Sequence, residues 1–313
     1  MELKELYWQN YFAPEIVSQA QKIRTTYQVS STGVILHVDA FEQSTSAPVL
    51  IFNHGAGGYS RLFTPLALAL WKLGYTVLLP DQVGQGLSKG MRPNLSITNF
   101  VANIVDVSIW ARKQHRGPIF LAGGSLGSGL TYYAAAAGAP VDALICHNLY
   151  AFGRMADVLA LSSFSWATAV PGLPFLFEKS IQLLAALMPN LPIPYQLLGK
   201  FARMVDRREP DFYAKWRADP VPLRWVTPRY LRSMFTTKTA VPFRKNQLPI
   251  LVINPTLDEM VDPKVTKRNF EQLSGPKTYA ELPFGHWALN AEFVTQWVDV
   301  VDSWCQSVLA NGM

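Results

Sequence analysis

The sequence predicts a protein of the α/β class, with a mostly parallel central sheet flanked by helices and a helical insertion in the chain. Two observations support this prediction. Short apolar runs that end in turns alternate with segments whose apolar residues recur at helical spacing. The alternation stops after residue 149 and resumes near residue 241, and the intervening segment is apolar and helical in pattern. Strands that alternate with helices form a mostly parallel sheet covered on both faces.

The predicted strands are short apolar runs bounded by turn residues. The first two form a hairpin-like pair around Ser31–Gly33, and the third ends in a glycine-rich turn, which is typical of a buried strand. In chain order, the predicted strands are Thr25–Val29, Val34–Ala40, Val49–Asn53, Tyr75–Pro80, Pro118–Ala122, Val141–Cys146, Ile250–Asn254 and Lys277–Leu282.

The predicted helices lie between these strands and carry start or stop signals. Ser96 can cap the helix that follows it, and Gly74 and Gly138 mark the ends of two others. The predicted helices are Arg61–Leu73, the segment after Ser96, Leu126–Ala137, Pro263–Leu273 and a last helix with Phe293, Trp297, Val300, Val301, Trp304 and Val308 on one face.

This organisation predicts a core domain of residues 1–149 and 241–313 and a helical cap of residues 150–240. The chain has 313 residues, 49% hydrophobic and 16% charged, so it can bury a sizeable core. Its only cysteines, Cys146 and Cys305, exclude a disulfide scaffold and are expected to be buried thiols. A secretory signal begins with basic residues that an apolar run follows. The first residues of this chain include acids, and no apolar run follows them, so a cytoplasmic protein is expected.

Charge is uneven in the predicted cap. Lys200–Lys245 holds 12 basic and 4 acidic residues, a net charge of +8, whereas the whole chain has +6. Val158–Gly199 contains only two charged residues, which separate two uncharged stretches of 20 residues. Each stretch is long enough to raise the question of a membrane span, but prolines interrupt both, which favours a buried or interfacial helical segment.

An apolar surface beside a basic one predicts peripheral contact of the cap with an anionic membrane. The alternative is that the apolar part packs against the core and the basic part is a solvated face. No nucleic-acid partner is expected, and the sequence does not indicate an oligomeric state.

The strongest catalytic signal is the run Gly123-Gly124-Ser125-Leu126-Gly127, which follows a predicted strand and precedes a predicted helix. This context is typical of a nucleophile elbow, where small residues two positions on either side of the serine permit a tight turn. Ser125 is therefore the predicted nucleophile. Ser128 is excluded, because Leu126 stands where an elbow around it needs a small residue.

A second signal is the turn from Asn53 to Gly58, directly after a predicted strand. A glycine-rich turn there can aim a backbone N–H at an oxyanion, although the glycines are also explained by a loop that needs positive φ. Within the turn, His54 is expected to brace the loop by hydrogen bonding and to have no catalytic role.

The remaining members of a catalytic triad are predicted in two later loops. His286 lies between the last strand and the last helix, and Asp258 follows strand Ile250–Asn254. Their chain order, Ser–Asp–His, is the order expected in α/β hydrolases. Glu259 and Asp262 occupy the same loop as Asp258 and are its alternatives as the acid.

The other histidines have weaker signals. His147 ends a strand on the side of the predicted site. With Tyr150 it is a candidate pocket residue, and a structural role is equally expected. His37 and His115 are expected to be ordinary surface or half-buried residues. The sequence has no metal-binding histidine spacing and no dinucleotide fingerprint, so neither a metal nor a cofactor is expected.

Three motifs carry a family resemblance: the turn beginning Asn53-His54-Gly55, the run Pro80–Gly90 and the acid loop Asp258–Pro263. They resemble motifs of monoacylglycerol lipases and their serine-aminopeptidase-like relatives in the α/β hydrolase superfamily. The resemblance covers roughly residues 30–150 and 245–310 and implies the α/β-hydrolase fold. It also implies that the backbone N–H groups of Ala56 and Leu126 hold the oxyanion.

The chain departs from that family at three positions near the site. The family usually has histidine where Gly124 and Gln85 stand, and glycine where Ser128 stands. These departures leave the predicted catalytic groups untouched and concern the subgroup, and therefore the substrate.

We therefore expect a serine hydrolase that cleaves acyl esters through an acyl-enzyme, resembling a carboxylesterase or lipase. An apolar cap suits a fatty acyl substrate such as a monoacylglycerol or a lysophospholipid. Three alternatives are an acyl-homoserine lactonase, an aminopeptidase whose acidic cap residues Asp206, Glu209 and Asp211 would bind an amine, and a non-catalytic ligand-binding protein of the same fold.

Overall fold

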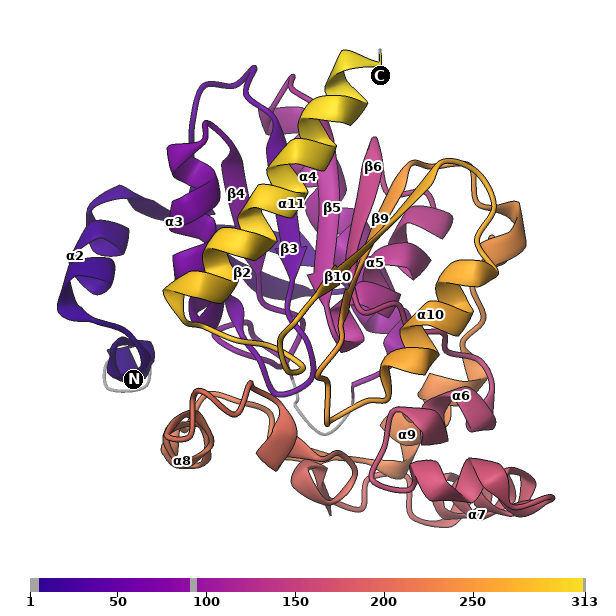
Figure 1. Ribbon diagram of the computed structural model, residues 1–313. Coiled ribbons are helices and arrows are strands. Elements are labelled where there is room, and N and C mark those ends of the chain that lie inside the picture. Colours follow the sequence, from indigo (N-terminus) through magenta and orange to yellow (C-terminus); the bar gives the residue numbers. More distant parts are fainter. Residues whose placement is uncertain (1–5, 91–94, 312–313) are drawn as a thin grey trace.

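A computed structural model of the chain describes residues 6–90 and 95–311. Its centre is an eight-stranded sheet with the strand order β1-β2-β4-β3-β5-β6-β9-β10. The pairs from β4 to β10 are parallel, whereas β1 and β2 form an antiparallel hairpin and β2 pairs antiparallel with β4. Helices cover both faces of the sheet (Figure 1), so the predicted fold class is confirmed.

The strands fall close to their predicted positions. β3, β4, β5, β6 and β9 are buried along their whole length, which explains their nearly continuous apolar sequences. The strands are β1 (Arg24–Ser31), β2 (Val34–Phe41), β3 (Val49–Asn53), β4 (Thr76–Pro80), β5 (Ile119–Gly124), β6 (Ala143–His147), β9 (Ile250–Pro255) and β10 (Lys277–Leu282).

Two hydrophobic clusters hold the helices on opposite faces of the sheet. One contains buried residues of α2 (Pro14–Ile23), α3 (Thr64–Lys72) and α11 (Ala291–Ala310). The other contains residues of α4 (Ile97–Gln114) and α5 (Leu126–Ala136), and α10 (Pro263–Glu271) packs against it. Burial of these apolar faces on both sides of the sheet supplies most of the favourable free energy of folding.

Two helical segments differ from the prediction. The helix expected from Arg61 begins as a 3₁₀ helix, η2 (Ser60–Phe63), and becomes α-helical only at Thr64. Pro65 explains the boundary, because a proline lacks the N–H that an interior position needs and fits the first turn instead. The amphipathic helix α2 was not predicted, since it precedes the alternating pattern on which the prediction relied.

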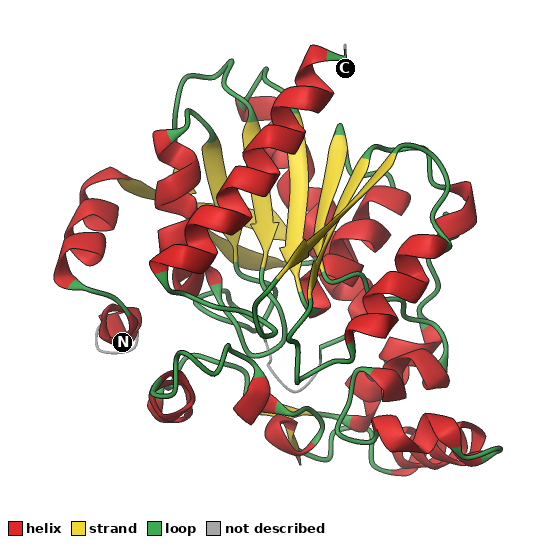
Figure 2. Ribbon diagram, in the orientation of Figure 1, coloured by secondary structure: helices red, strands yellow, loops and turns green. Residues whose placement is uncertain are grey.

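Between β6 and β9 the chain forms a largely helical segment that lies across the carboxyl ends of the strands (Figure 2). Its α-helices and its short strand pair are α6 (Met155–Ala160), α7 (Leu173–Leu187), β7 (Ile193–Pro194), α8 (Phe212–Ala218), β8 (Trp225–Val226) and α9 (Pro228–Thr236). Loops after parallel strands converge at this edge of a sheet, so the segment faces the predicted catalytic residues.

Over residues 6–90 and 95–311, no helix is both long enough and apolar enough to cross a bilayer. Cys146 and Cys305 are buried free thiols.

Candidate active site

Ser125 occupies the sharp turn between β5 and α5. Its backbone has φ of 57° and ψ of −127°, a conformation that residues with a side chain rarely adopt and that stores strain. The Ser125 N–H donates to the carbonyl of His147 in the neighbouring strand at 3.0 Å, which anchors the turn to the sheet. This strand–turn–helix geometry is that of a nucleophile elbow.

The glycines around Ser125 are explained by close backbone contacts. A Cβ atom at Gly123 would collide with the Gly127 carbonyl, and one at Gly127 would collide with the carbonyls of Asn53 and His54. A Cβ atom at Gly124 would lie 3.1 Å from the Trp287 ring. The indole thus fills the space beside a position where the family resemblance would place a histidine side chain.

Ser128, the excluded alternative, has a local partner. Its hydroxyl donates to the Ser125 carbonyl at 2.7 Å, one turn back along α5. A serine bonded in this way supports the start of the helix.

The turn after β3 packs directly against Ser125. A Cβ atom at Gly55 would lie only 2.8 Å from the Ser125 Cβ, and Ala56 lines the same cavities as Ser125. The imidazole of His54 braces the turn, because its Nδ1 donates to the Gly55 carbonyl at 2.9 Å and its Nε2 accepts from the Gln82 N–H at 3.3 Å. Burial lowers the pKa of His54, consistent with a neutral ring.

Asp258 and His286 are brought together by the loops after β9 and β10. The His286 Nδ1 lies 2.7 Å from the Asp258 Oδ2, and both side chains are buried. The other oxygen, Oδ1, accepts the backbone N–H groups of Met260 and Val261 at 2.8 and 2.9 Å. The carboxylate is therefore fixed, and a proton on Nδ1 leaves the Nε2 of His286 able to accept one from a hydroxyl.

The two alternatives for the acid make other contacts. Glu259 forms ion pairs with Arg203 and Arg207. Asp262 is the N-cap of α10, where its carboxylate accepts the Lys264 N–H at 2.9 Å. Among the three carboxylates, the hydrogen bond to the imidazole of His286 is made by Asp258.

The two candidate pocket residues differ in position. His147 is fully buried behind the site, and its Nε2 donates to the backbone carbonyl of His286 at 2.9 Å. Burial lowers its pKa to about 3, so the ring is neutral and supports the His286 loop. Tyr150 lines the larger cavity. Burial is the main cause that raises the pKa of Tyr150, and the charge of Asp258 raises it further. A hydrogen bond with the Ser125 side chain acts in the opposite direction.

Two cavities share Ala56, Ser125 and Met260 in their walls. The larger, which we call the large chamber, has a volume of about 350 Å³ and lies under the inserted segment. The smaller, about 60 Å³, is lined by His286 as well and is called the small chamber. Apolar residues of the large chamber include Met155, Leu159, Phe177, Ile181, Leu184 and Met234, and those of the small chamber include Leu62, Phe63, Phe212, Trp287 and Leu289.

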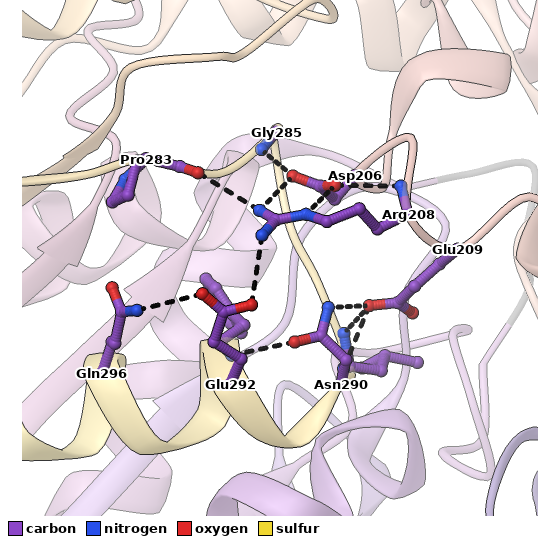
Figure 3. A network of polar contacts seen from close by, with 10 residues as sticks. Asp206, Arg208, Glu209, Pro283, Gly285, Asn290, Glu292 and Gln296 are labelled. Atoms are coloured by element: carbon purple, nitrogen blue, oxygen red, sulfur yellow. Dashed lines mark hydrogen bonds and ion pairs between the residues drawn. The ribbon is translucent and has the colours of Figure 1, made fainter.

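The loop that carries His286 is also held from the inserted segment, by a polar network that the sequence did not predict (Figure 3). Asp206 accepts the Gly285 N–H at 2.6 Å, and Arg208 donates to the Pro283 carbonyl at 3.1 Å. The only sequence signal was a charged run, Asp206–Glu209, which is usually a solvated surface.

Comparison with known proteins identifies the family of this chain. The family described as "Serine aminopeptidase, S33" matches residues 44–286, more than half of the chain. The chain belongs to this family. Its S33 membership confirms the resemblance seen in the motifs, and with the fold it makes the protein a lipase-like α/β hydrolase.

Curated relatives and solved structures agree with the S33 assignment. A monoglyceride lipase homolog of Monkeypox virus is 27% identical over 228 residues, 70% of this chain and 74% of its own length. Human monoglyceride lipase is 26% identical over 244 residues, 75% and 74% of the two chains. The crystal structure of Paleococcus ferrophilus monoacylglycerol lipase has a TM-score of 0.67 at 20% identity and covers 87% of this chain and 99% of its own, which shows the shared fold.

Within residues 6–90 and 95–311, no group of three or more histidine, cysteine or acidic side chains is arranged to hold a metal ion.

Proposed function

We propose that the protein hydrolyses carboxylic esters of apolar acyl groups through Ser125, His286 and Asp258. The observation that carries the proposal is that Ser125, on a strained elbow, lines a large apolar chamber and shares a second cavity with an imidazole hydrogen-bonded to a buried carboxylate. Each part is common by itself, but the combination is what acyl transfer to and from a serine requires.

In the proposed mechanism, the Ser125 hydroxyl attacks the ester carbonyl while the Nε2 of His286 takes its proton. The backbone N–H groups of Ala56 and Leu126 stabilise the oxyanion, the latter from the first turn of α5, where N–H groups lack intrahelical partners. His286 then protonates the departing alcohol, and a water activated by the same imidazole releases the acid. Asp258 keeps the proton on Nδ1 and stabilises the imidazolium.

The two chambers suggest where each half of the ester binds. We place the acyl chain in the large chamber, since its volume of about 350 Å³ falls in the range of small-molecule sites and its walls are mainly apolar. The alcohol half then lies in the small chamber, which His286 lines, because the group that receives the proton must lie beside the imidazole.

Two of the three acidic residues that an aminopeptidase would use to bind a free amine have other partners, and the third, Asp211, does not line either chamber at Ser125. Asp206 accepts the Gly285 N–H, and Glu209 accepts the backbone N–H groups of Leu289 and Asn290 at 2.6 and 3.0 Å. Neither carboxylate lines the chambers at Ser125. We therefore favour ester over aminoacyl amide substrates.

A substrate panel tests this proposal against its alternatives. It contains acyl esters of increasing chain length, a monoacylglycerol, a lysophospholipid, an acyl-homoserine lactone and an aminoacyl amide. Faster turnover of medium- and long-chain esters than of acetyl esters, the lactone or the amide is expected. Failure of a fluorophosphonate probe to label the folded protein would instead favour a non-catalytic ligand-binding role.

Ile181→Trp is expected to shift the chain-length preference toward short acyl groups. Ile181 lies on α7 and lines the large chamber, so an indole there removes space from the acyl chain. The ratio of kcat/KM for a dodecanoyl ester to that for a butanoyl ester is expected to fall by about tenfold or more. Leu183→Trp is the control, because Leu183 lies on the same helix with 61% of its surface exposed. An equal effect of both variants would contradict the assignment of the chamber.

We further propose that the inserted segment, residues 150–240, is a cap domain that docks on an anionic lipid bilayer. Nine large apolar side chains of this segment are exposed, and all but Trp225 lie between residues 166 and 197, where they form an apolar patch: Trp166, Val170, Phe175, Leu176, Leu183, Leu187, Met188 and Leu197. Helix α7 has no buried residue and presents apolar side chains both to the large chamber and to the outside. A surface helix that is apolar on both faces favours a lipid environment.

The positive charges beside this apolar patch support an anionic bilayer as the partner. Lys179 and Lys200 are exposed next to it. Some basic residues of the stretch Lys200–Lys245 are not free to bind lipid headgroups. Arg203 and Arg207 pair with Glu259, and Arg224 donates to backbone carbonyls. The apolar patch is therefore expected to supply most of the affinity, with each free cation adding on the order of 1 kcal/mol at low salt.

The double variant Leu183→Glu/Leu187→Glu is expected to lose most binding to vesicles of phosphatidylglycerol and phosphatidylcholine. Both side chains are more than half exposed, so the change puts charge on the lipid face without disturbing the core. Co-sedimentation at low and high salt measures the effect, and Leu73→Glu, an exposed leucine on the core domain, is the control. Equal sedimentation of the double variant and the wild type, or wild-type binding that ignores lipid charge and salt, would refute the docking proposal.

A further inference from the structure

We propose that one piece of the inserted segment, Asp206–Asp219, positions both the catalytic base and the oxyanion turn. We call it the clamp segment. It contacts the loop of His286 at one end and the turn of Ala56 at the other, and it supplies no group that reacts with substrate. This inference rests on the ester-hydrolase function proposed above.

The first contact brackets His286 on both sides along the chain. The Asp206 carboxylate accepts the N–H of Gly285 at 2.6 Å (Figure 3). The Asp206 N–H donates to the carbonyl of Trp287 at 2.7 Å. The residues before and after His286 are thus bonded to one residue of the clamp. The fit is close, because a Cβ atom at Gly285 would lie 2.8 Å from the Asp206 Cα.

Arg208 and Glu209 extend this contact along the loop. Arg208 donates to both oxygens of Asp206 and to the Pro283 carbonyl. Its hydrogen bond lowers the pKa of Asp206 to about 2, so the carboxylate stays ionised at neutral pH. Glu209 accepts the N–H groups of Leu289 and Asn290, the residues that lead into α11. The clamp segment therefore bonds to backbone groups both before and after the base along the chain.

The second contact fixes the oxyanion turn. The Trp216 indole N–H donates to the Gly57 carbonyl at 2.8 Å, next in sequence to Ala56. Gly57 has φ of +70°, and a Cβ atom there would lie 2.9 Å from the Trp216 ring. The indole also stacks on the Phe201 ring, with centroids 5.3 Å apart, and the guanidinium of Arg224 lies 4.2 Å from its ring centroid.

The end of the turn is held by the residue that closes the clamp. The buried Asp219 carboxylate accepts the hydroxyl of Tyr59 at 2.9 Å and that of Tyr11 from the N-terminal region at 2.9 Å. Gly57 and Tyr59 are therefore both bonded to the clamp, within three residues of Ala56.

The chemistry gives a reason for holding these two loops together. The base and the oxyanion donor lie on loops from different strands, and a misplacement of about 1 Å can cost about a hundredfold in rate. A segment bonded to both loops fixes their separation. Loosening one end of the clamp should therefore lower kcat while leaving substrate binding in the large chamber intact.

The experiment compares two loosening variants and one conservative variant with matched controls. Asp206→Ala removes the bond to Gly285, and Asp206→Asn keeps an oxygen that can accept it. Trp216→Phe removes the indole N–H but retains an aromatic ring. The controls are Glu292→Gln, which alters the exposed end of the Arg208 network, and Trp225→Phe, an exposed tryptophan of β8. The readouts are kcat and KM on a medium-chain ester, the rate of fluorophosphonate labelling, and Tm.

We expect kcat and the labelling rate to fall by about 10-fold to 100-fold in Asp206→Ala and Trp216→Phe, with KM changed by less than about twofold. Asp206→Asn should recover most of the loss, and both controls should match the wild type. If Trp216→Phe does not fold, the benzothienyl analogue of tryptophan at position 216 keeps the ring shape and replaces the N–H with sulfur.

Wild-type kcat and labelling rates in the folded variants, or equal losses in the controls, would overturn the clamp. A wild-type protein that neither hydrolyses esters nor reacts with the probe would instead overturn the proposed function, so the two failures are distinguishable.

Discussion

Ser125→Ala is expected to abolish ester hydrolysis and fluorophosphonate labelling while leaving the fold intact. Removing the nucleophile of a comparable triad lowers kcat on the order of 10⁶-fold, and the remaining rate reflects binding and the oxyanion hole alone. Alanine lacks the hydroxyl but keeps the Cβ that packs against Gly55, so the turn should keep its shape. Turnover of a medium-chain ester and covalent labelling measure the effect.

The control for this prediction is Ser128→Ala, three residues further along the chain. Its hydroxyl bonds to the Ser125 carbonyl, so its loss should lower the free energy of unfolding by about 1 kcal/mol and change kcat little. Retention of full activity by a correctly folded Ser125→Ala protein would exclude the serine-hydrolase mechanism.

Asp258→Asn is expected to lower kcat by up to about 10⁴-fold. The asparagine oxygen can still accept the N–H groups of Met260 and Val261, so the loop should keep its shape. The amide then presents a donor to the Nδ1 of His286, which favours the wrong tautomer and leaves the imidazolium without its counter-charge. The measurement is kcat on the same ester, with circular dichroism to verify the fold.

Asp262→Asn is the matched control from the same loop. Asp262 caps α10, and asparagine is an equally good capping residue, so both the stability and kcat should stay close to the wild type. A larger loss in Asp262→Asn than in Asp258→Asn would reverse the assignment of the acid.

One of the three departures from the family motifs, at Gly124, gains a physical meaning in the structure. Gly124 replaces the histidine common before the nucleophile, and the Trp287 ring lies against it. Trp287 also lines the small chamber together with Leu289 and Phe63. This departure thus lies in the part of the site where we place the alcohol half of the ester. Substrate differences within the family are expected there first.

Much of the fold could be predicted from the sequence, because its signals are local. Apolar runs and turn residues predicted where each strand of the sheet begins and ends to within a few residues. The small residues around Ser125 and the serine cap of α4 are likewise dictated by the backbone within a few positions. Local sterics and hydrogen bonds act over the same short distances as sequence patterns, and this is why such features can be predicted.

Other features were decided only by the tertiary structure. The loop holding Asp258, Glu259 and Asp262 left three candidates for the acid, and only packing shows which carboxylate contacts His286. His147 was a candidate pocket residue, yet it lies behind the His286 loop.

The clamp is the clearest case of tertiary control. Asp206 bonds to Gly285, 79 positions away, and Trp216 bonds to Gly57, 159 positions away. In the sequence, these residues appear as part of a charged run and as one aromatic residue among several. Their role arises because folding brings distant backbone groups into burial, where each N–H and carbonyl needs a partner. The sequence by itself determined the strands, the elbow and the candidate residues, whereas the packing of the inserted segment on the core decided how they are positioned.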